Sequence, residues 1–367
     1  MTNYRRIAAG QILLIRTNAD SRIGAGHVMR CLALAQAWQN AGGRAIFLSQ
    51  LPETLINRLT AERIEYIPAN TPCHDPADLA QILKQAAILG TRQPKKLLLV
   101  LDGYHFTPKY QQTLRQAGLQ TLVLDDYGHL PVTHARWLLN QNPWADAIDY
   151  TDRLDPDCCL LTGLTYALIR LEFIAVASQK RTHIEKYPLR VLVTMGGSDP
   201  TNTTELIVEV LSAARLPSLT YTVVTGPAYR WQQALKNRFS VAHLAGEVLT
   251  NVADISKCMT QTDLAITAGG STCWELACLG VPMLVLALAE NQTRTGPALA
   301  AAGAAIDLGR LEETPNGRLR LASCITDSLV RLLHDNQARM IMAEAGRHIV
   351  DGYGADRVIA KLLKNRS

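Results

Sequence analysis

Short apolar runs alternate with segments of helical periodicity along most of this 367-residue chain. Strands that are apolar almost throughout, each followed by a helix, are typical of a parallel sheet covered on both faces. The pattern therefore constrains the first half of the chain to an α/β fold. We expect its strands at 11–15, 44–49, 64–67, 97–101, 120–124 and 136–139, and its helices near 28–40, 53–61, 76–89 and 108–117.

The alternation restarts after a stretch at 180–190 that contains Lys, Arg and His. We predict two doubly wound, Rossmann-like domains that face a central cleft, the first over residues 1–182 and the second over 183–367. Ligands bind such sheets at the carboxyl ends of the strands, where the strand order reverses. The second series begins with the strand that ends in Thr-Met-Gly-Gly, continues with strands at 220–225, 264–268, 283–287 and 304–308, and finishes with helices at 336–349 and 355–364.

Composition excludes several classes of protein. Hydrophobic residues make up 48% and charged residues 19% of the chain, which is typical of a globular protein. The net charge of +5 is spread thinly and aromatic residues reach only 5%, so we expect no nucleic-acid partner. No stretch approaches the roughly 20 apolar residues of a membrane span. The apolar run after Arg5 and Arg6 is too short for a signal peptide, so the expected location is the cytoplasm, and a monomer is the default expectation.

The eight cysteines show no Cys-x-x-Cys spacing. We expect Cys31, Cys273 and Cys278 to lie in helices as small hydrophobic residues.

The first glycine loop resembles a dinucleotide-binding fingerprint but departs from it at two points. In Gly24-x-Gly26-x-x-Met29 a methionine replaces the third glycine, which close helix–strand packing needs. The second strand runs into Ser49-Gln50 instead of ending in an acidic residue. No Gly-Lys-Ser/Thr follows the glycines, which excludes a P-loop. We therefore predict no nicotinamide, flavin or other cofactor.

His27 stands where the first helix begins. The helix field there favours a neutral imidazole, which can accept a proton. A capping or packing role is the alternative. Arg16 and Asp20 could orient His27 or a substrate, or pair with each other. Arg30 could face the cleft or the solvent.

Two further glycine turns follow strands of the second domain. In 194–202, Ser198 or Asp199 can cap a helix and leave free amides for a ligand. In 266–275, two glycines precede Ser271-Thr272, and their amides and hydroxyls suit a diphosphate at a helix N-terminus. Glu275, one turn later, could accept hydrogen bonds from ribose hydroxyls. Each turn alone could be an ordinary capped helix start, but together the turns indicate a nucleotide-sugar site.

The second-domain motifs resemble a known family. Gly269-Gly270-Ser271-Thr272-x-x-Glu275, Gly280-Val281-Pro282 and Asn291-Gln292 are similar to the UDP-GlcNAc transferase of lipid II synthesis. The first-domain motifs narrow the resemblance to the UDP-2,4-diacetamido-2,4,6-trideoxy-β-L-altropyranose hydrolase family of pseudaminic acid synthesis. They are Ile23-Gly24-x-Gly26-His27-x-x-Arg30-Cys31-Leu32-x-Leu34-Ala35, Asp102-x-Tyr104, Leu138-Leu139-Asn140, Tyr166-Ala167-Leu168-Ile169-Arg170-x-Glu172-Phe173 and Met195-Gly196-Gly197-Ser198-Asp199.

That resemblance implies a GT-B fold and a metal-independent hydrolase. Water would replace UDP at the anomeric carbon with inversion, and His27 would be the general base. Tyr104 and Asn291 would lie beside the sugar, and Ser271, Thr272 and Glu275 on the nucleotide side. The full set of residues expected to bind the UDP-sugar is Arg16, Asp20, Gly24, Gly26, Tyr104, Asn142, Arg170, Gly197, Ser198, Gly270, Ser271, Thr272, Glu275, Asn291 and Gln292.

Other functions remain open at this stage. A glycosyltransferase could use the same UDP site with a sugar or lipid acceptor, and a third possibility is a nucleotide-sugar-binding protein without turnover. Asp155-Pro-Asp157 has the spacing of a metal-binding pair, but no His or Glu clusters with it, so we expect a turn. Asp125 and Asp126 are expected to shape the wall of the cleft.

Overall fold

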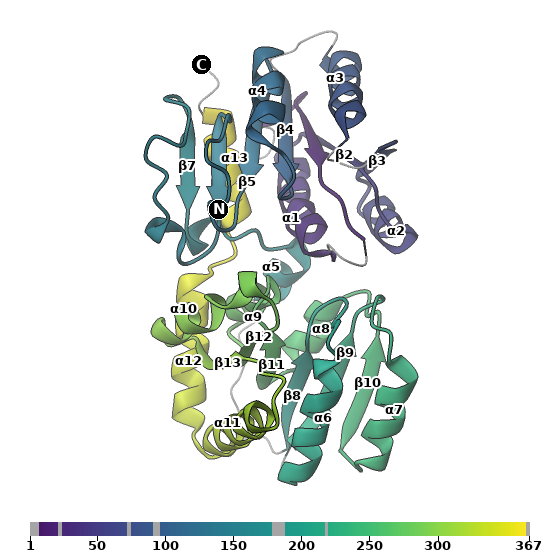
Figure 1. Ribbon diagram of the computed structural model, residues 1–367, viewed down its shortest axis with the longest axis vertical. Helices are drawn as coiled ribbons and strands as arrows, with labels where there is room; N and C mark the ends of the chain where they lie inside the picture. Colours follow the sequence, from purple (N-terminus) through teal and green to yellow (C-terminus); the bar gives the residue numbers. More distant parts are fainter. Residues whose placement is uncertain are drawn as a thin grey trace. The chain divides into compact units, whose positions relative to one another are not determined.

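The computed structural model describes residues 7–20, 24–71, 75–90, 96–177, 188–216 and 219–364. The chain forms two compact units, the first made of 1–171 and 352–367 and the second of 172–351. Each unit is a parallel sheet with helices packed against it (Figure 1). The predicted fold class is confirmed, and the central cleft between the domains stays a prediction.

The sheet of the first unit has the strand order β3-β2-β1-β4-β5-β6-β7, with all neighbours parallel. Because β1 pairs with both β2 and β4, the strand order reverses between β1 and β4. The strands are β1 (Ile12–Arg16), β2 (Arg44–Ser49), β3 (Glu65–Pro68), β4 (Leu97–Asp102), β5 (Gln120–Leu124), β6 (Trp137–Asn140) and β7 (Cys159–Thr162).

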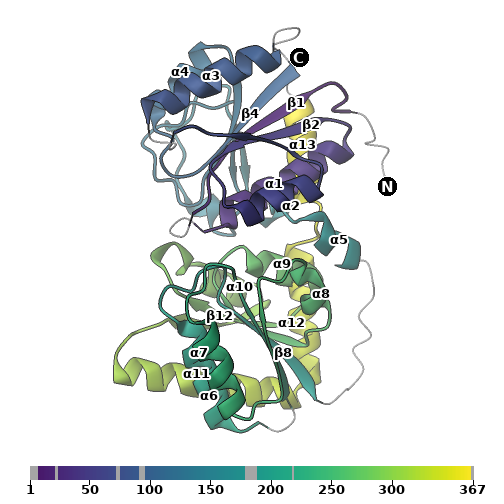
Figure 2. The same cartoon turned by 90° about the vertical axis from the view of Figure 1, so that its right-hand side faces the viewer.

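Helices cover both faces of this sheet (Figure 2). α1 (Gly26–Asn40), α2 (Glu53–Ala61) and α13 (Gly354–Lys364) share one core with Leu13 and Ile15 of β1. α3 (Pro76–Gly90) and α4 (Pro108–Gln116) share the opposite core with Leu14, because successive strand residues point to opposite faces. One face of α1 is buried against the sheet: Val28, Cys31, Leu32, Ala35 and Trp38.

The last helix of the chain belongs to the first unit, whereas the sequence-based division placed it in the second domain. α13 follows the second unit in sequence but packs on α1 of the first, with Val358, Ile359 and Leu362 buried. The sequence-based division assigned all of 183–367 to the second domain. The boundary at 182/183 and most of the predicted linker lie outside the described residues, and the short α5 (Leu171–Ala177) ends just before them.

The second unit repeats the same plan with the strand order β10-β9-β8-β11-β12-β13. Its strand order reverses between β8 and β11. α11 packs on α6, and α12 packs on α9. The strands are β8 (Leu189–Thr194), β9 (Leu219–Thr225), β10 (Gly246–Thr250), β11 (Leu264–Ala268), β12 (Met283–Ala287) and β13 (Ala305–Arg310), and the helices are α6 (Thr203–Ala214), α7 (Gln232–Val241), α8 (Ile255–Thr260), α9 (Thr272–Leu279), α10 (Thr295–Ala301), α11 (Pro315–His334) and α12 (Asn336–Ile349).

Most predicted strands and helices lie within two residues of the observed ones. β7, β10, α5 and α11 were not predicted. β7 and β10 are edge strands and are only partly buried, so they lack the continuous apolar run of the central strands. Within the described ranges, no helix is both long and apolar enough to cross a membrane.

Candidate functional site

A charged cluster lies where the strand order of the first unit reverses. His27 and Arg30 stand on the first turns of α1, Asp102 is the last residue of β4, and Asp126 follows β5. Residues three apart on a helix share a face, so His27 and Arg30 both point toward the strand ends. β4 pairs with β1 and β5 in parallel, which brings the carboxyl ends of these strands to one edge of the sheet.

Hydrogen bonds join all four side chains. His27 Nδ1 is 2.6 Å from Asp102 Oδ1. The Arg30 guanidinium binds Asp102 in a two-pronged geometry, with Nε–Oδ2 at 2.7 Å and Nη2–Oδ1 at 2.6 Å. Its Nη1 donates to Asp126 Oδ1 at 2.6 Å. Such fork-shaped, charge-assisted pairs are strong and directional, so Arg30 fixes both carboxylates relative to the helix.

The electrostatics of the cluster keep both carboxylates ionised. Burial opposes the charge of Asp102, but Arg30 and His27 outweigh it and hold its pKa below the usual range. Burial likewise opposes the charge of Asp126, and Arg30 again lowers the pKa of that carboxyl. Burial disfavours the Arg30 cation, yet the two carboxylates raise its pKa well above the ordinary value. Two carboxylates and one guanidinium leave one net negative charge beside His27.

This arrangement selects the protonation pattern of the His27 ring. Arg30 Nη2 also lies 3.0 Å from Nδ1, but the shorter contact of Nδ1 is the one to Asp102. An ionised Asp102 can only accept a hydrogen bond, so this contact assigns the hydrogen to Nδ1. The neutral imidazole then has its lone pair on Nε2. Among the described residues Nε2 has no protein partner, and the side chain is 12% exposed. His27 can therefore accept a proton at Nε2 from a small molecule, and the capping role considered for it is not observed.

Tyr104 and Asn142 complete the surroundings of Asp126. The Tyr104 hydroxyl donates to Asp126 Oδ2 at 2.7 Å, and its ring packs edge-on against the His27 ring at 5.1 Å between centroids. Asn142 Nδ2 is 3.2 Å from Asp126 Oδ1. Burial and the Asp126 charge raise the pKa of Tyr104, so its hydroxyl stays protonated. The structure thus brings two of the predicted substrate-binding residues to the cluster.

A second network lies directly behind this cluster. Asp125 accepts hydrogen bonds from Tyr150 Oη at 2.7 Å and from His129 Nδ1 at 3.3 Å. Burial opposes its charge, but these bonds lower the pKa of Asp125 below the usual range. Its carboxylate also binds the backbone amides of 126–128. Asp125 therefore holds the loop that carries Asp126 and does not face the cluster itself.

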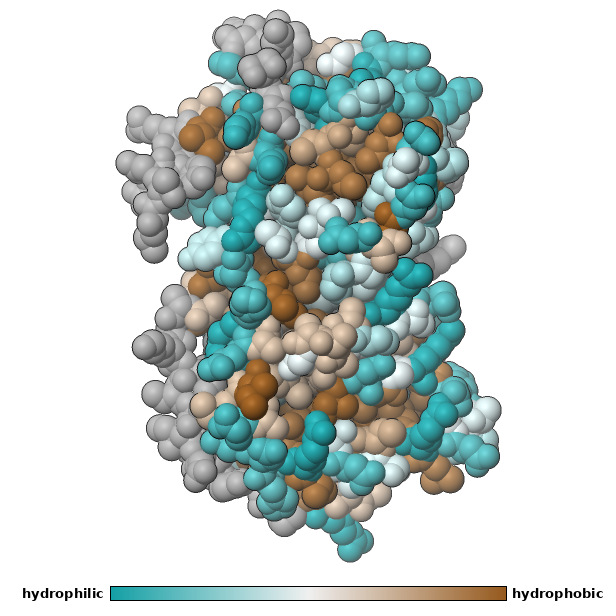
Figure 3. Space-filling view, turned by 90° about the vertical axis from the view of Figure 1, so that its left-hand side faces the viewer, coloured by the Kyte–Doolittle hydropathy of each residue, from teal (hydrophilic) through white to brown (hydrophobic). Residues whose placement is uncertain are grey.

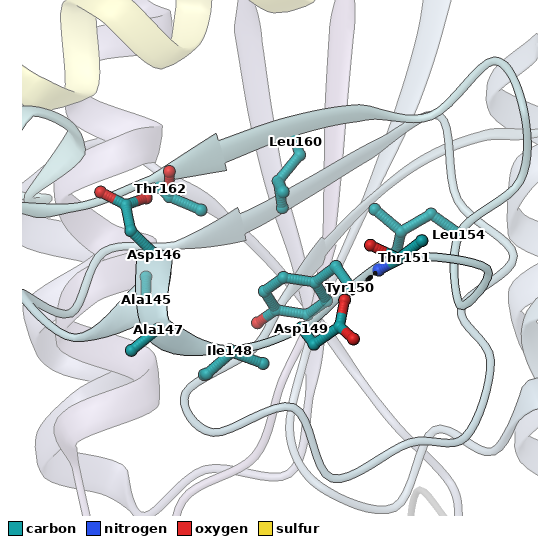
Figure 4. A pocket seen from close by; sticks show the side chains of 10 residues that line it. All are labelled: Ala145, Asp146, Ala147, Ile148, Asp149, Tyr150, Thr151, Leu154, Leu160 and Thr162. Carbon is teal, nitrogen blue, oxygen red and sulfur yellow. Dashed lines mark hydrogen bonds between the residues drawn. The ribbon is translucent and has the colours of Figure 1, made fainter.

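Tyr150 also lines a hollow of about 600 Å³ beside β7. Its ring lies in the middle of the lining, with Asp146 and Thr162 on one side and Leu154 on the other (Figure 4). On the side where β7 lies, apolar side chains gather over the first unit (Figure 3), and Leu160 of β7 is partly exposed. Tyr150 thus lines the hollow and also donates to Asp125, the neighbour of Asp126 in the chain.

Arg16 has a structural role that the sequence did not reveal. Its guanidinium is fully buried and donates to Asp78 at 2.8 Å, to Asn18, and to the backbone carbonyls of Thr17 and Leu48. These bonds occupy the donors that a substrate would need, so Arg16 is not part of the proposed site. Asp20, the other residue considered with it, is exposed.

The remaining predicted residues of the first unit lie near the cluster or at its margin. Gly24 has a φ of +74°, which favours glycine, and its amide donates to the Asp20 carbonyl. Gly26 begins α1 and has open space where a side chain would stand. Arg170 is half-buried and lies just before α5. Ile23 of the glycine-loop motif lies outside the described residues.

In the second unit, the loop after β11 supplies backbone and hydroxyl groups. Ser271 precedes α9 without a side-chain cap, and no protein acceptor for the amides of Ser271 and Thr272 is found among the described residues. A Cβ on Gly269 would come within 3.0 Å of the Gln292 carbonyl, whereas Gly270 has open space. Gly269 thus permits close packing, and Gly270 leaves room for a ligand.

Side chains around this loop hold it in place. The Thr295 hydroxyl donates to the Gly269 carbonyl at 2.9 Å, and Gln292 accepts from the Leu288 amide at 3.0 Å. Asn291, its neighbour in the short 3₁₀ turn Glu290–Gln292, is exposed. Glu275 is half-buried in the first turn of α9. Gln292 therefore has an observed structural contact, while Asn291 presents its side chain to solvent.

The loop after β8 differs from the expectation in one respect. Asp199 is buried and accepts hydrogen bonds from the amides of Thr203 and Thr204, at 2.9 and 2.7 Å. The first amides of α6, expected to be free for a ligand, are thus occupied. Gly197 is exposed and Ser198 half-buried in the preceding turn. Of the two loop residues predicted to bind the substrate, both therefore have some exposed surface.

Three members of the charged cluster were not in the predicted site. Asp102 was named only in the motif Asp102-x-Tyr104, and Asp126 only as a residue of the cleft wall. Arg30 was expected to face either the cleft or the solvent. One signal could have found them: acidic residues at or just after the ends of two neighbouring buried strands, together with a basic residue one turn into the first helix. Such residues meet at the edge where ligands bind.

Asp155 and Asp157 form the expected turn, in which the Cys158 amide donates to the Asp155 carbonyl. Their carboxylates pair with Arg115 and His134. Within the part of the chain that the structure describes, no three His, Cys, Asp or Glu side chains are grouped as metal ligands.

Two Rossmann-like units, each with glycine turns at the reversal of its strand order, define a protein of the GT-B type. Among solved structures, MurG of Acinetobacter baumannii has this fold, with a TM-score of 0.61 and 18% identity over 96% of this chain and 99% of that one. Residues 190–344 match the Glycosyltransferase family 28 C-terminal domain. The GT-B architecture predicted from the motifs is confirmed.

Two relatives make the resemblance more specific. The UDP-2,4-diacetamido-2,4,6-trideoxy-β-L-altropyranose hydrolase of Campylobacter jejuni is 26% identical over 292 residues, which cover 79% of this chain and 97% of the hydrolase. The spore coat polysaccharide biosynthesis protein SpsG of Bacillus subtilis is 34% identical over 190 residues, or 51% of this chain. The match spans only about half of SpsG, 53% of its length. The resemblance to the hydrolase predicted from the motifs is confirmed.

Proposed function

We propose that this protein is an enzyme of UDP-sugar metabolism that hydrolyses a UDP-linked 2,4-diacetamido-2,4,6-trideoxy-L-altrose to UDP and the free sugar, in pseudaminic acid biosynthesis. The observation that carries the proposal is the His27–Asp102 pair, in which a buried carboxylate orients an imidazole whose Nε2 has no partner among the described residues. The relation to the Campylobacter hydrolase over nearly its whole length supports the choice of substrate.

In the proposed reaction His27 acts as the general base. A water molecule donates its proton to Nε2 while its oxygen forms a bond to the anomeric carbon. The bond from that carbon to the phosphate oxygen breaks, and UDP leaves with the electron pair from the opposite face, so the configuration inverts. A placed base contributes about 10²–10⁴ to such a rate. The proton gained by His27 neutralises the one net negative charge that Asp102, Asp126 and Arg30 provide.

The second unit is proposed to bind the UDP. The amides and hydroxyls of Ser271 and Thr272 would donate to the diphosphate, and the helix field of α9 would stabilise its charge as the sugar bond breaks. Gly270 leaves space for the phosphates to approach. Glu275 would accept from the ribose hydroxyls, and Asn291 would contact the sugar. Gly197 and Ser198 would contribute from the neighbouring loop.

A UDP-sugar-dependent glycosyltransferase is the second candidate. The match of residues 190–344 to the Glycosyltransferase family 28 C-terminal domain favours this candidate. The UDP site proposed above would serve a transferase as well as a hydrolase. In that case His27 would take the proton from an acceptor hydroxyl in place of water. The two functions differ only in the nucleophile that is admitted beside His27.

The test is UDP release from a panel of UDP-sugars without any acceptor, comparing wild type with His27→Ala. We expect release from the L-altro diacetamido sugar, its loss in His27→Ala, and an unchanged affinity for UDP. His134→Ala is the matched control, because His134 also pairs with an aspartate, Asp155 at 2.9 Å, but lies outside the cluster. It should keep full activity.

Two results would contradict the proposal. If no donor releases UDP although UDP binds, the transferase becomes the better account. If His27→Ala loses UDP affinity together with activity, His27 is a binding or folding residue and not the base.

A further inference from the structure

Tyr127 displays an aromatic ring beside the proposed catalytic cluster. It follows Asp126 in the loop after β5, and 45% of the residue is exposed. We infer that the Tyr127 ring is a platform on which an apolar part of the substrate sugar packs, and that it thereby determines which UDP-sugar is bound. The inference rests on the proposed function, because it deepens the substrate recognition of the same site.

The loop that carries Tyr127 is held by the protein itself. Asp125 accepts from the amides of Asp126 at 2.8 Å, Tyr127 at 3.3 Å and Gly128 at 2.9 Å. Gly128 has a φ of +66°, and a Cβ there would lie 2.6 Å from a methyl of Ile148. The ring is therefore displayed on a fixed backbone, which reduces the entropy lost when a ligand packs on it.

The rings around Tyr127 connect it to His27. Its ring lies 5.2 Å from that of Tyr104 and 5.1 Å from that of His129, measured between centroids. Tyr104 in turn lies 5.1 Å from the His27 ring. The rings of Tyr127, Tyr104 and His27 thus form a continuous series of aromatic contacts that ends at the proposed base. The Tyr104 hydroxyl is already bonded to Asp126.

The chemistry of such a surface selects C–H groups over hydroxyls. An aromatic face gains from apolar contact and offers few hydrogen bonds to compensate a desolvated hydroxyl. The 6-deoxy, diacetamido sugar of the proposed substrate carries three methyl groups, one on the ring and one on each acetamido group. A sugar with a hydroxymethyl group in place of the ring methyl would be bound less well.

The experiment measures binding in the His27→Ala background, where no turnover should consume the ligand. Titration calorimetry would compare UDP with the UDP-linked diacetamido sugar, with and without Tyr127→Ala. We expect Tyr127→Ala to weaken binding of the UDP-sugar by about tenfold or more, as for lost apolar pocket contacts. Binding of UDP alone should not change, and Tyr127→Phe should restore the affinity. Ile88→Ala, which truncates an exposed side chain on α3, is the control.

The outcomes separate this inference from the proposed function. Equal affinity of the UDP-sugar with and without Tyr127→Ala would overturn the inference, even if wild type hydrolyses the substrate. Equal weakening of UDP and UDP-sugar would also overturn it, because Tyr127 would then act on folding or on the nucleotide. If wild type fails to release UDP, the proposed function fails, while the difference between the two affinities still decides the role of Tyr127.

Discussion

In the first unit the strands beside the reversal of strand order end in charged side chains, whereas in the second they end in glycines and hydroxyls. The scaffold is the same: a parallel sheet whose first strand lies between later ones. The first unit uses His27, Arg30 and Asp102, most of them buried, and the second uses the backbone around Gly269 and Ser271. One topology thus positions either titratable groups for proton transfer or amides for an anion.

The contrast between a side-chain site and a backbone site predicts which mutations each unit is sensitive to. A site made of side chains loses its chemistry when one side chain changes, although the backbone is kept. A site made of backbone loses its shape when a glycine gains a methyl group, although no functional side chain is removed. The predictions below test these two kinds of sensitivity.

The largest effect is expected for Asp102→Asn. Asparagine can donate as well as accept, so it no longer requires the hydrogen on Nδ1 of His27, and the lone pair is no longer held at Nε2. We expect kcat for UDP release to fall by about 10²–10⁴, with UDP affinity unchanged. Steady-state kinetics and UDP titration would check this. A loss smaller than about threefold would show that Asp102 does not orient the base.

The charged cluster should also make stability depend on acid pH. The folded-state pKa of Asp102 is lowered, so the unfolded chain binds a proton more readily than the folded one. The stability that this group contributes is present above its unfolded pKa of about 3.9 and is lost as the pH falls further. Urea unfolding should show Asp102→Asn to be less stable than wild type by on the order of 1–3 kcal/mol at pH 7. The gap should narrow between about pH 4 and pH 2, and a constant gap would contradict an ionised Asp102.

Gly269 and Gly270 of the second unit test the sensitivity of a backbone site to an added methyl group. Gly269→Ala places a Cβ 3.0 Å from a backbone carbonyl and 3.3 Å from Thr295 Cβ, so we expect a loss of about 1–2 kcal/mol of stability. Gly270→Ala is the matched control, because its methyl group enters open space and should change stability by less than about 0.5 kcal/mol.

Only Gly270→Ala should weaken UDP binding without changing stability, because its methyl group would stand where the diphosphate approaches. Urea unfolding and UDP titration measure the two effects separately. Normal UDP affinity in Gly270→Ala would place the diphosphate away from this loop.

Periodicity predicted the central strands and most helices because these elements bury a regular pattern of apolar residues. β7 and β10 were missed because an edge strand is partly solvated and loses that pattern. The Rossmann-like units followed from the alternation of strands and helices, and the resemblance to the hydrolase followed from the motifs. The position of α13 did not, because its partner helix α1 lies more than 300 residues away in the chain.

The site was predicted less completely than the fold. His27, Tyr104 and Asn142, each predicted as a site residue, lie around one cluster, but their connection runs through Asp102 and Asp126, which are 75 and 99 residues after His27. Sequence spacing does not reveal contacts over such separations. Arg16 was considered for a substrate contact but binds protein groups instead. Asp199, considered as a helix cap, binds the first amides of α6, which were expected to be free for a ligand. The sequence does not show which buried polar partners the fold brings together.

The return of α13 to the first unit has a consequence for biosynthesis. Residues 354–364 leave the ribosome only after the entire second unit, yet Val358, Ile359 and Leu362 complete a core that begins with β1. Until they emerge, the matching face of α1 stays unprotected on the nascent chain. The usual order, in which an amino-terminal domain folds first during synthesis, is therefore modified here. The first unit can finish folding only when translation has passed the second.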